Sequence, residues 1–99
     1  MTAVSYEVSI TVREDLSTAF EAYMIETHIP EVMATGAFSS ATFATIEAGR
    51  FRASYNAAGR EELDNYLRDH SPRLRQVVAE HFPEGLEISR EEWKVLAEF

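Results

Sequence analysis

The chain has 99 residues, of which 45% are hydrophobic, and its 17 Asp and Glu residues outnumber nine Lys and Arg to give a net charge of −8. One domain with one core is expected at this length, and the acidic balance without a basic cluster excludes nucleic acids and anionic membrane surfaces as favoured partners. The absence of cysteine excludes thiol catalysis and disulfide bonds. With neither a secretory signal pattern nor a membrane-spanning apolar run, we expect a cytoplasmic protein.

The N-terminal third predicts a strand followed by a helix. Residues 4–12 alternate polar and apolar side chains, which indicates a strand with one buried face. Helical spacing follows, and Pro30 disfavours helical geometry at the residue before it. This helix should therefore end near Thr27 or His28, and Pro30 should begin a short second helix over residues 31–35.

The middle of the chain predicts a hairpin and two further helices. Residues 37–47 and 50–56 have strand patterns separated by a short turn. An apolar stripe at helical spacing covers residues 59–70. A Ser-Pro pair, which is a favoured helix start, then opens a helix over residues 71–82.

The last predicted strand covers residues 86–96, and its apolar residues do not all fall on alternate positions. Ile88 and Trp93 fall on opposite parities of the strand. A β-bulge near residues 89–92 would bring them to one face.

The predicted order is strand, helix, strand, strand, helix, strand. The two halves resemble each other, because residues 23–30 match residues 66–72 with one residue deleted. A repeated βαβ unit gives an α+β, ferredoxin-like fold, in which a four-stranded antiparallel sheet carries its helices on one face.

The second face of such a sheet needs a cover when it carries apolar residues. Phe43 has the opposite parity to Phe38, and three further apolar residues lie near the C-terminus, at Trp93, Val95 and Phe99. Since not all of these can face the helices, we expect a homodimer with Phe43, Trp93, Val95 and Phe99 as candidate interface residues.

Three blocks of the chain form a specific pattern, and they are residues 28–36 (HIPEVMATG), residues 38–41 (FSSA) and residues 71–75 (SPRLR). Together these blocks resemble a family of small bacterial domains of unknown function, DUF4286. The likeness extends from residue 6 to residue 96, with Ser71 where that family often has Ala. The resemblance implies a dimeric α/β barrel and no assigned catalytic residue. The wider group includes cofactor-independent monooxygenases, haem- and chlorite-processing enzymes and isomerases.

His28 and His70 are the residues best suited to acid–base chemistry. Each is predicted at a helix C-terminus, where the helix dipole favours the protonated imidazole and raises its pKa. His28 is the candidate catalytic residue, and the simpler alternative is that both histidines cap helices. Together with His81 they show no metal-ligand spacing, so we expect neither a metal nor a cofactor.

Aromatic residues suggest a pocket between the helices and the sheet. Tyr23, His28, Tyr66 and Trp93 are the candidate ligand-binding residues. The alternative is that these rings form a packed core with polar tips at its rim.

Three functions follow from these observations. The leading hypothesis is a small homodimeric protein that binds a small ligand or acts as an accessory module. The second is a cofactor-independent monooxygenase or isomerase acting on a small aromatic or polyketide-like substrate. The third is a protein-interaction or assembly module. Function on this scaffold depends on the site and not on the fold.

Overall fold

The computed structural model describes residues 3–99 of the chain. Within them the elements follow the predicted order, with the helices divided into shorter segments. They are β1 (Val4–Val12), η1 (Glu14–Leu16), α1 (Ser17–Tyr23), the π-helical turn η2 (Met24–His28), α2 (Ile29–Ala34), β2 (Phe38–Glu47), β3 (Arg50–Ala57), α3 (Arg60–Asp69), α4 (Ser71–His81) and β4 (Leu86–Lys94).

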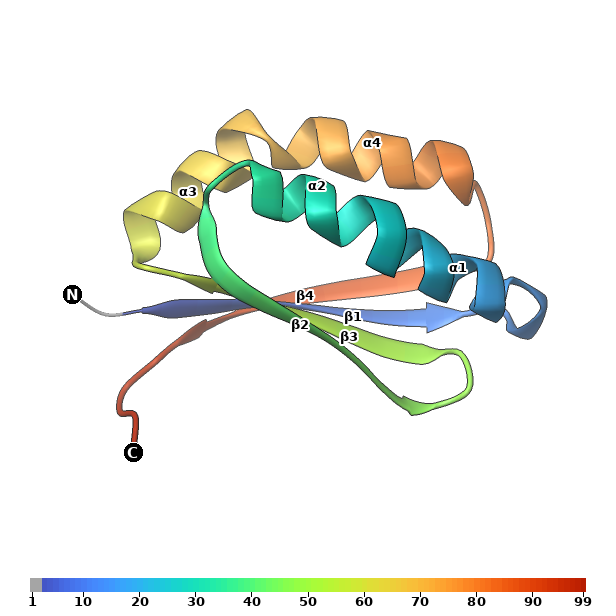
Figure 1. The fold of residues 1–99 in the computed structure, drawn as a ribbon, viewed down its shortest axis with the longest axis horizontal. Helices are drawn as coiled ribbons and strands as arrows, with labels where there is room; N and C mark the ends of the chain where they lie inside the picture. The colour runs from blue at the N-terminus through green and yellow to red at the C-terminus, as the bar shows by residue number, and fades with distance from the viewer. Residues whose placement is uncertain (1–2) are drawn as a thin grey trace.

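The four strands form one antiparallel sheet in the order β2-β3-β1-β4. All the helices lie on the same face of this sheet (Figure 1), so the molecule has two layers. The arrangement is the predicted ferredoxin-like fold. None of the helices within residues 3–99 is long and apolar enough to cross a membrane.

The core lies between the helices and the sheet. Alternate side chains of β1 and β3 are buried against the helices, as expected for strands with one covered face. The helices contribute the largest fully buried side chains, which are Phe20, Val32, Leu63 and Leu74. Each of the four helices α1, α2, α3 and α4 contributes one of these residues to the core between the two layers.

The first helix does not end near Thr27 or His28, and that prediction is wrong. The chain continues from α1 through η2 into α2, because the backbone N–H of Ile29 donates to the carbonyl of Met24, five residues earlier. This widened turn accommodates Pro30, which has no N–H to donate and would crowd the preceding turn of a regular helix. His28 therefore lies inside a continuous helical segment.

The predicted bulge in β4 is also absent. Pairing between β1 and β4 runs without a shift from Val4 opposite Lys94 to Val12 opposite Leu86. Ile88 faces the helices because it pairs with the buried Ile10, whereas Trp93 pairs with Ser5 and points to the other face. The change of parity thus reflects one apolar residue, Trp93, on the otherwise polar second face of a regular strand.

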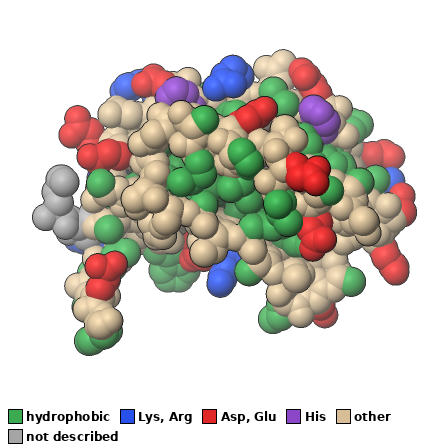
Figure 2. Space-filling model, viewed as in Figure 1, with side chains coloured by type: hydrophobic (Ala, Val, Ile, Leu, Met, Phe, Trp, Pro, Cys, Tyr) green, Lys and Arg blue, Asp and Glu red, His purple; other side chains and the backbone are tan. Residues whose placement is uncertain are grey.

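The register shifts lie in β2 instead, and one of them moves Phe43. A shift between Phe38 and Ser40 places Phe38 and Phe43 on the same face, although their parities differ. Phe43 stacks on Phe51 at 5.2 Å between ring centroids, on the helix side of the sheet. Figure 2 shows hydrophobic side chains at the surface between α2 and β2. Phe43 therefore does not lie on the uncovered face, contrary to the prediction.

The uncovered face of the sheet is largely polar. The Glu7 carboxylate accepts a hydrogen bond of 2.9 Å from the hydroxyl of Ser54 and lies 3.5 Å from Nε of Arg52. Trp93 on the edge strand β4 is the large apolar exception, with 52% of its surface exposed. We call this side, which carries Glu7, Arg52, Ser54 and Trp93, the open sheet face.

Candidate functional site

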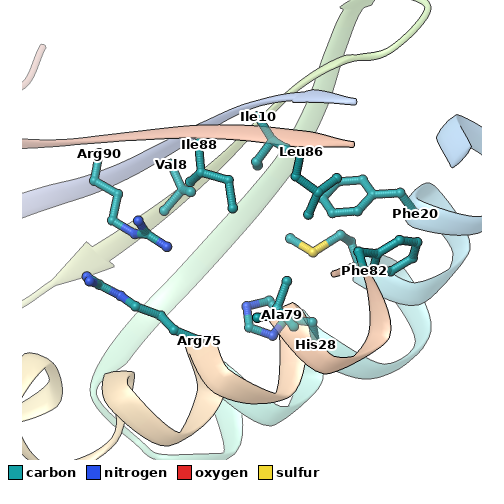
Figure 3. A pocket seen from close by; sticks show the side chains of 12 residues that line it. Val8, Ile10, Phe20, His28, Arg75, Ala79, Phe82, Leu86, Ile88 and Arg90 are labelled. Carbon is teal, nitrogen blue, oxygen red and sulfur yellow. The ribbon is translucent and has the colours of Figure 1, made fainter. Parts of the chain in front are cut away.

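A cavity of about 220 Å³ separates the helices from the β1–β4 half of the sheet. Figure 3 shows β4 on one side of it and the α1 and α4 segments on the other. Its wall is mainly apolar and includes Val8, Ile10, Phe20, Phe82, Leu86 and Ile88. We call it the main cavity. Ala79 of α4 presents only a methyl group to it, which leaves space that a larger side chain would fill.

A smaller cavity of about 40 Å³ lies deeper, and we call it the inner cavity. His28, Arg75 and Arg90 line both cavities, so the two are neighbours. Tyr66 and Leu74 line the inner cavity but not the main cavity. The helices and the sheet thus flank one site that opens to solvent at Arg75, Ala79, Ile88 and Arg90, with an apolar outer part and a more polar inner part.

Two arginines mark one end of the main cavity. Arg75 extends from α4 and Arg90 from β4, and Figure 3 shows both on the side away from Phe20 and Phe82. Arg75 donates a hydrogen bond of 3.1 Å to the hydroxyl of Tyr6. Within residues 3–99, neither guanidinium is paired with a carboxylate, and no Asp or Glu lines either cavity.

His28 faces both cavities from the widened turn η2. Its Nδ1 atom is buried and has no hydrogen-bond partner among the described residues. Burial lowers the pKa of His28, and the charge of Arg90 lowers it further, while Glu31 opposes the shift. The predicted rise of this pKa is wrong, because His28 lies within a continuous helical segment and is half-buried. The imidazole is neutral near pH 7.

Tyr66 places a phenol in the inner cavity beside His28. Burial raises the pKa of Tyr66 to about 12, and the positive charges of Arg75 and Arg90 oppose the shift. Burial raises the pKa of the neighbouring Tyr55 as well. Both phenols remain protonated at neutral pH, so they can donate hydrogen bonds to a bound molecule.

The structure places His28 and Tyr66 at the inner cavity and leaves the other two candidate ligand-binding residues outside both cavities. Tyr23 lies next to His28, with 6.2 Å between the centroids of their stacked rings, but it lines neither cavity and also packs 4.6 Å from the ring of His81. Trp93 lies on the open sheet face, so its predicted place in a pocket with His28 is wrong. Strand parity is the reason, because Trp93 is an odd number of residues from the cavity residues Ile88 and Arg90.

Sequence reasoning missed Arg75 and Arg90. Arg90 shares its parity with Leu86 and Ile88, which is the signal that places it on the helix side of β4. His70, by contrast, caps the C-terminus of α3 as predicted and lines neither cavity. Within residues 3–99, no three His, Asp or Glu side chains gather in an arrangement that could hold a metal ion.

The fold resembles several solved structures at low sequence identity. A protein of unknown function from Nitrosomonas europaea is 13% identical, with a TM-score of 0.74 over 100% of this chain and 94% of that one. A candidate antibiotic biosynthesis monooxygenase from Bordetella bronchiseptica is 22% identical, with a TM-score of 0.65 over 97% and 100%. A dimeric ferredoxin-like protein from an uncultured marine organism is 14% identical, with a TM-score of 0.61 over 99% and 98%.

These similarities show the fold alone, and no curated protein matches the chain. The family assignment comes from the sequence. The model of the domain of unknown function DUF4286 matches residues 3–96, which is nearly the whole chain. The agreement confirms the resemblance noted from the blocks around His28 and Ser71. This chain therefore belongs to the DUF4286 family.

Proposed function

We propose that this protein binds a small, mainly apolar molecule in the main cavity. The observation that carries the proposal is an apolar cavity whose polar groups gather at one end, which is the usual form of a ligand site. Its volume of about 220 Å³ lies below the range of about 300–1,000 Å³ that is common for drug-sized ligands. A molecule of one or two rings, or a short acyl chain, is the size that fits.

Titration of the ¹⁵N-labelled protein with 1-naphthamide, a neutral two-ring probe, tests this proposal. The expected result is a saturable shift of backbone amide signals around the cavity, for example at Val78 and Ile88. An Ala79→Phe variant should abolish these shifts, because the new ring fills the space next to the Ala79 methyl group.

The matched control is Ala22→Phe, which adds the same ring at an exposed position of α1 that does not line the cavity. It should leave the binding unchanged. Shifts confined to the open sheet face, or equal binding by the two variants, would contradict binding in the main cavity.

We also propose that the chain forms a homodimer through the open sheet face. Trp93 is exposed there, and it is followed by the apolar residues Val95 and Phe99. One structurally similar protein is described as dimeric, which supports the proposal. A two-fold axis would bury the same patch of both copies.

Sedimentation velocity of a Trp93→Asp variant tests the dimer. The variant should sediment as a monomer, because the interface would have to bury a carboxylate without a partner. The control is Ile25→Asp, which changes a residue that is 57% exposed on the helical layer. A Trp93→Asp protein that stays dimeric would remove this residue from the interface.

An enzymatic role is the second candidate, and His28 is the observation that favours it. A neutral imidazole that lines a cavity can accept a proton from a bound substrate. Such a step would serve a cofactor-independent monooxygenase or an isomerase, and one structural neighbour is a candidate monooxygenase. The probe is 2-tetralone, a neutral two-ring ketone that exchanges its α-hydrogens for deuterium once a base removes them.

Exchange should be faster with the wild-type protein than in buffer, and a His28→Gln variant should lose the acceleration. His81→Gln, which changes an exposed histidine outside the cavity, is the control. Equal rates for the wild type and His28→Gln would leave His28 without a catalytic role.

A further inference from the structure

The charge at the main cavity is opposite to the charge of the whole chain. The protein carries a net charge of −8, yet among residues 3–99 the only ionic side chains that line the two cavities are Arg75 and Arg90. Of the six other arginines, all outside the cavities, five lie within 4.0 Å of a carboxylate, and they are Arg13, Arg50, Arg52, Arg60 and Arg68. The sixth is Arg73 on α4, for which no such ion pair occurs among the described residues. Carboxylates are abundant in the chain, but in the described part of it none lies within 4.0 Å of the Arg75 or Arg90 guanidinium group.

We infer that the natural ligand carries a carboxylate, which Arg75 and Arg90 bind while its apolar part lies in the main cavity. This inference rests on the proposed function, and it adds the chemical class of the ligand. The two side chains come from elements on opposite sides of the cavity, α4 and β4 (Figure 3), so an anion between them can contact both. Guanidinium groups bind carboxylates through paired N–H donors with strong, directional hydrogen bonds.

The surroundings favour an anion in two further ways. Arg75 is held by its hydrogen bond of 3.1 Å to Tyr6, so one donor group is already positioned before the ligand arrives. An anion would also offset the repulsion between two positive side chains at the same cavity. The neighbouring Tyr66 phenol is protonated and can donate a further hydrogen bond to a carboxylate oxygen.

The apolar part of the site indicates the chemical character of the rest of the ligand. Phe20 and Phe82 lie 5.4 Å apart between ring centroids and stand at the end of the cavity away from the arginines. An aromatic acid and a medium-chain fatty acid share the required chemistry, since each has an apolar body and one terminal carboxylate. They differ in shape, and binding measurements can separate them.

Calorimetric titration with two matched pairs of probes tests the inference. The pairs are 1-naphthoate with 1-naphthamide, and octanoate with octanamide, in which each amide has the shape of its acid without the charge. At least one acid should bind about tenfold more tightly than its amide, as expected for hydrogen bonds to a charged group. The stronger acid identifies the aromatic or the aliphatic class.

The arginine variants locate the effect. Arg75→Gln and Arg90→Gln should each weaken binding of the acid about tenfold and leave that of the amide within about twofold. Arg75→Lys, which keeps the charge, should recover part of the loss. Arg73→Gln is the control, because it removes the same charge from α4 at a residue that does not line either cavity.

The outcomes separate this inference from the proposed function. If both members of each pair bind equally in the cavity, ligand binding stands and the anion inference is wrong. If an acid is preferred but the Arg75 and Arg90 variants bind it as the wild type does, the recognition is wrongly assigned to these residues. If no probe binds, the proposed function fails and the inference fails with it.

Discussion

Replacing Leu74 with alanine should enlarge the inner cavity at a known cost in stability. Leu74 is 1% exposed on α4 and lines the inner cavity. The matched control is Leu63→Ala on α3, because Leu63 is 0% exposed and lines neither cavity. The two variants remove the same three carbon atoms from fully buried positions.

The expected loss follows from burial. Removing three carbons costs about 2.4 kcal/mol in transfer free energy, at about 0.8 kcal/mol for each buried group. The void that remains adds to this, and the total free energy of unfolding should fall by about 3–4 kcal/mol in each variant. For a domain of this size, each kcal/mol lowers the Tm by about 4–8 °C, so both variants should melt about 12–32 °C below the wild type.

Urea unfolding and calorimetric titration with 1-naphthamide measure the two effects. Only the Leu74→Ala protein should bind this probe more tightly than the wild type, because its new space adjoins the ligand site. Bound probe should then stabilise this variant and raise its Tm. At a free probe concentration of one hundred times the Kd, the free energy of unfolding should increase by about 2.7 kcal/mol. A loss below about 1 kcal/mol would show that Leu74 is not packed as described. If Leu74→Ala loses the expected amount of about 3–4 kcal/mol of stability but binds 1-naphthamide no more tightly than the wild type, the inner cavity does not connect with the ligand site.

Two further predictions concern a turn and a buried histidine. Both Gly49 and Gly36 have φ near +80°, but only at Gly49 would a Cβ lie 2.7 Å from a backbone oxygen of β1. In urea unfolding, Gly49→Ala should therefore destabilise the protein by at least about 1 kcal/mol more than Gly36→Ala. Equal losses of stability in the two variants would refute this contact. Burial lowers the pKa of His28 in the folded protein below its ordinary value of 6.5. As the pH falls below about 6.5, His28 therefore becomes protonated more readily in the unfolded chain than in the folded one, and the folded protein loses stability. A Tm profile from pH 7 to pH 5 should therefore be flatter for His28→Gln than for the wild type or for His81→Gln, and parallel profiles would contradict the burial of His28.

The fold was predictable from the sequence because the spacing of apolar residues and the order of the predicted strands and helices are robust signals. The alternation in β1 and the order of strands and helices identify a ferredoxin-like sheet without any knowledge of contacts. Two local features were not predictable. The face of Phe43 depends on a one-residue shift at the start of β2, and the course of the helix past Pro30 depends on hydrogen bonds that spacing does not reveal.

The candidate site was predicted only in part, for a related reason. His28 and Tyr66 stand out by residue type, and the structure places both at the inner cavity. Arg75 and Arg90 resemble ordinary exposed charges in the sequence, and only the way that α4 packs over β4 places them at the same cavity. Pairwise placement of polar groups depends on tertiary contacts, which local patterns do not encode.

The turn at Met24–His28 can be regarded as an insertion that the helix absorbs without breaking. The first half of the chain has one residue more than the second half between the matching Tyr and Pro positions, and the widened turn lies in this stretch. Each residue turns a regular helix by about 100°. Over the eight residues from Phe20 to His28 a regular helix would turn the two side chains about 80° apart, whereas over seven residues they would lie nearly in line. The widened turn takes up the additional residue, so Phe20 and His28 both line the main cavity from one continuous helical segment.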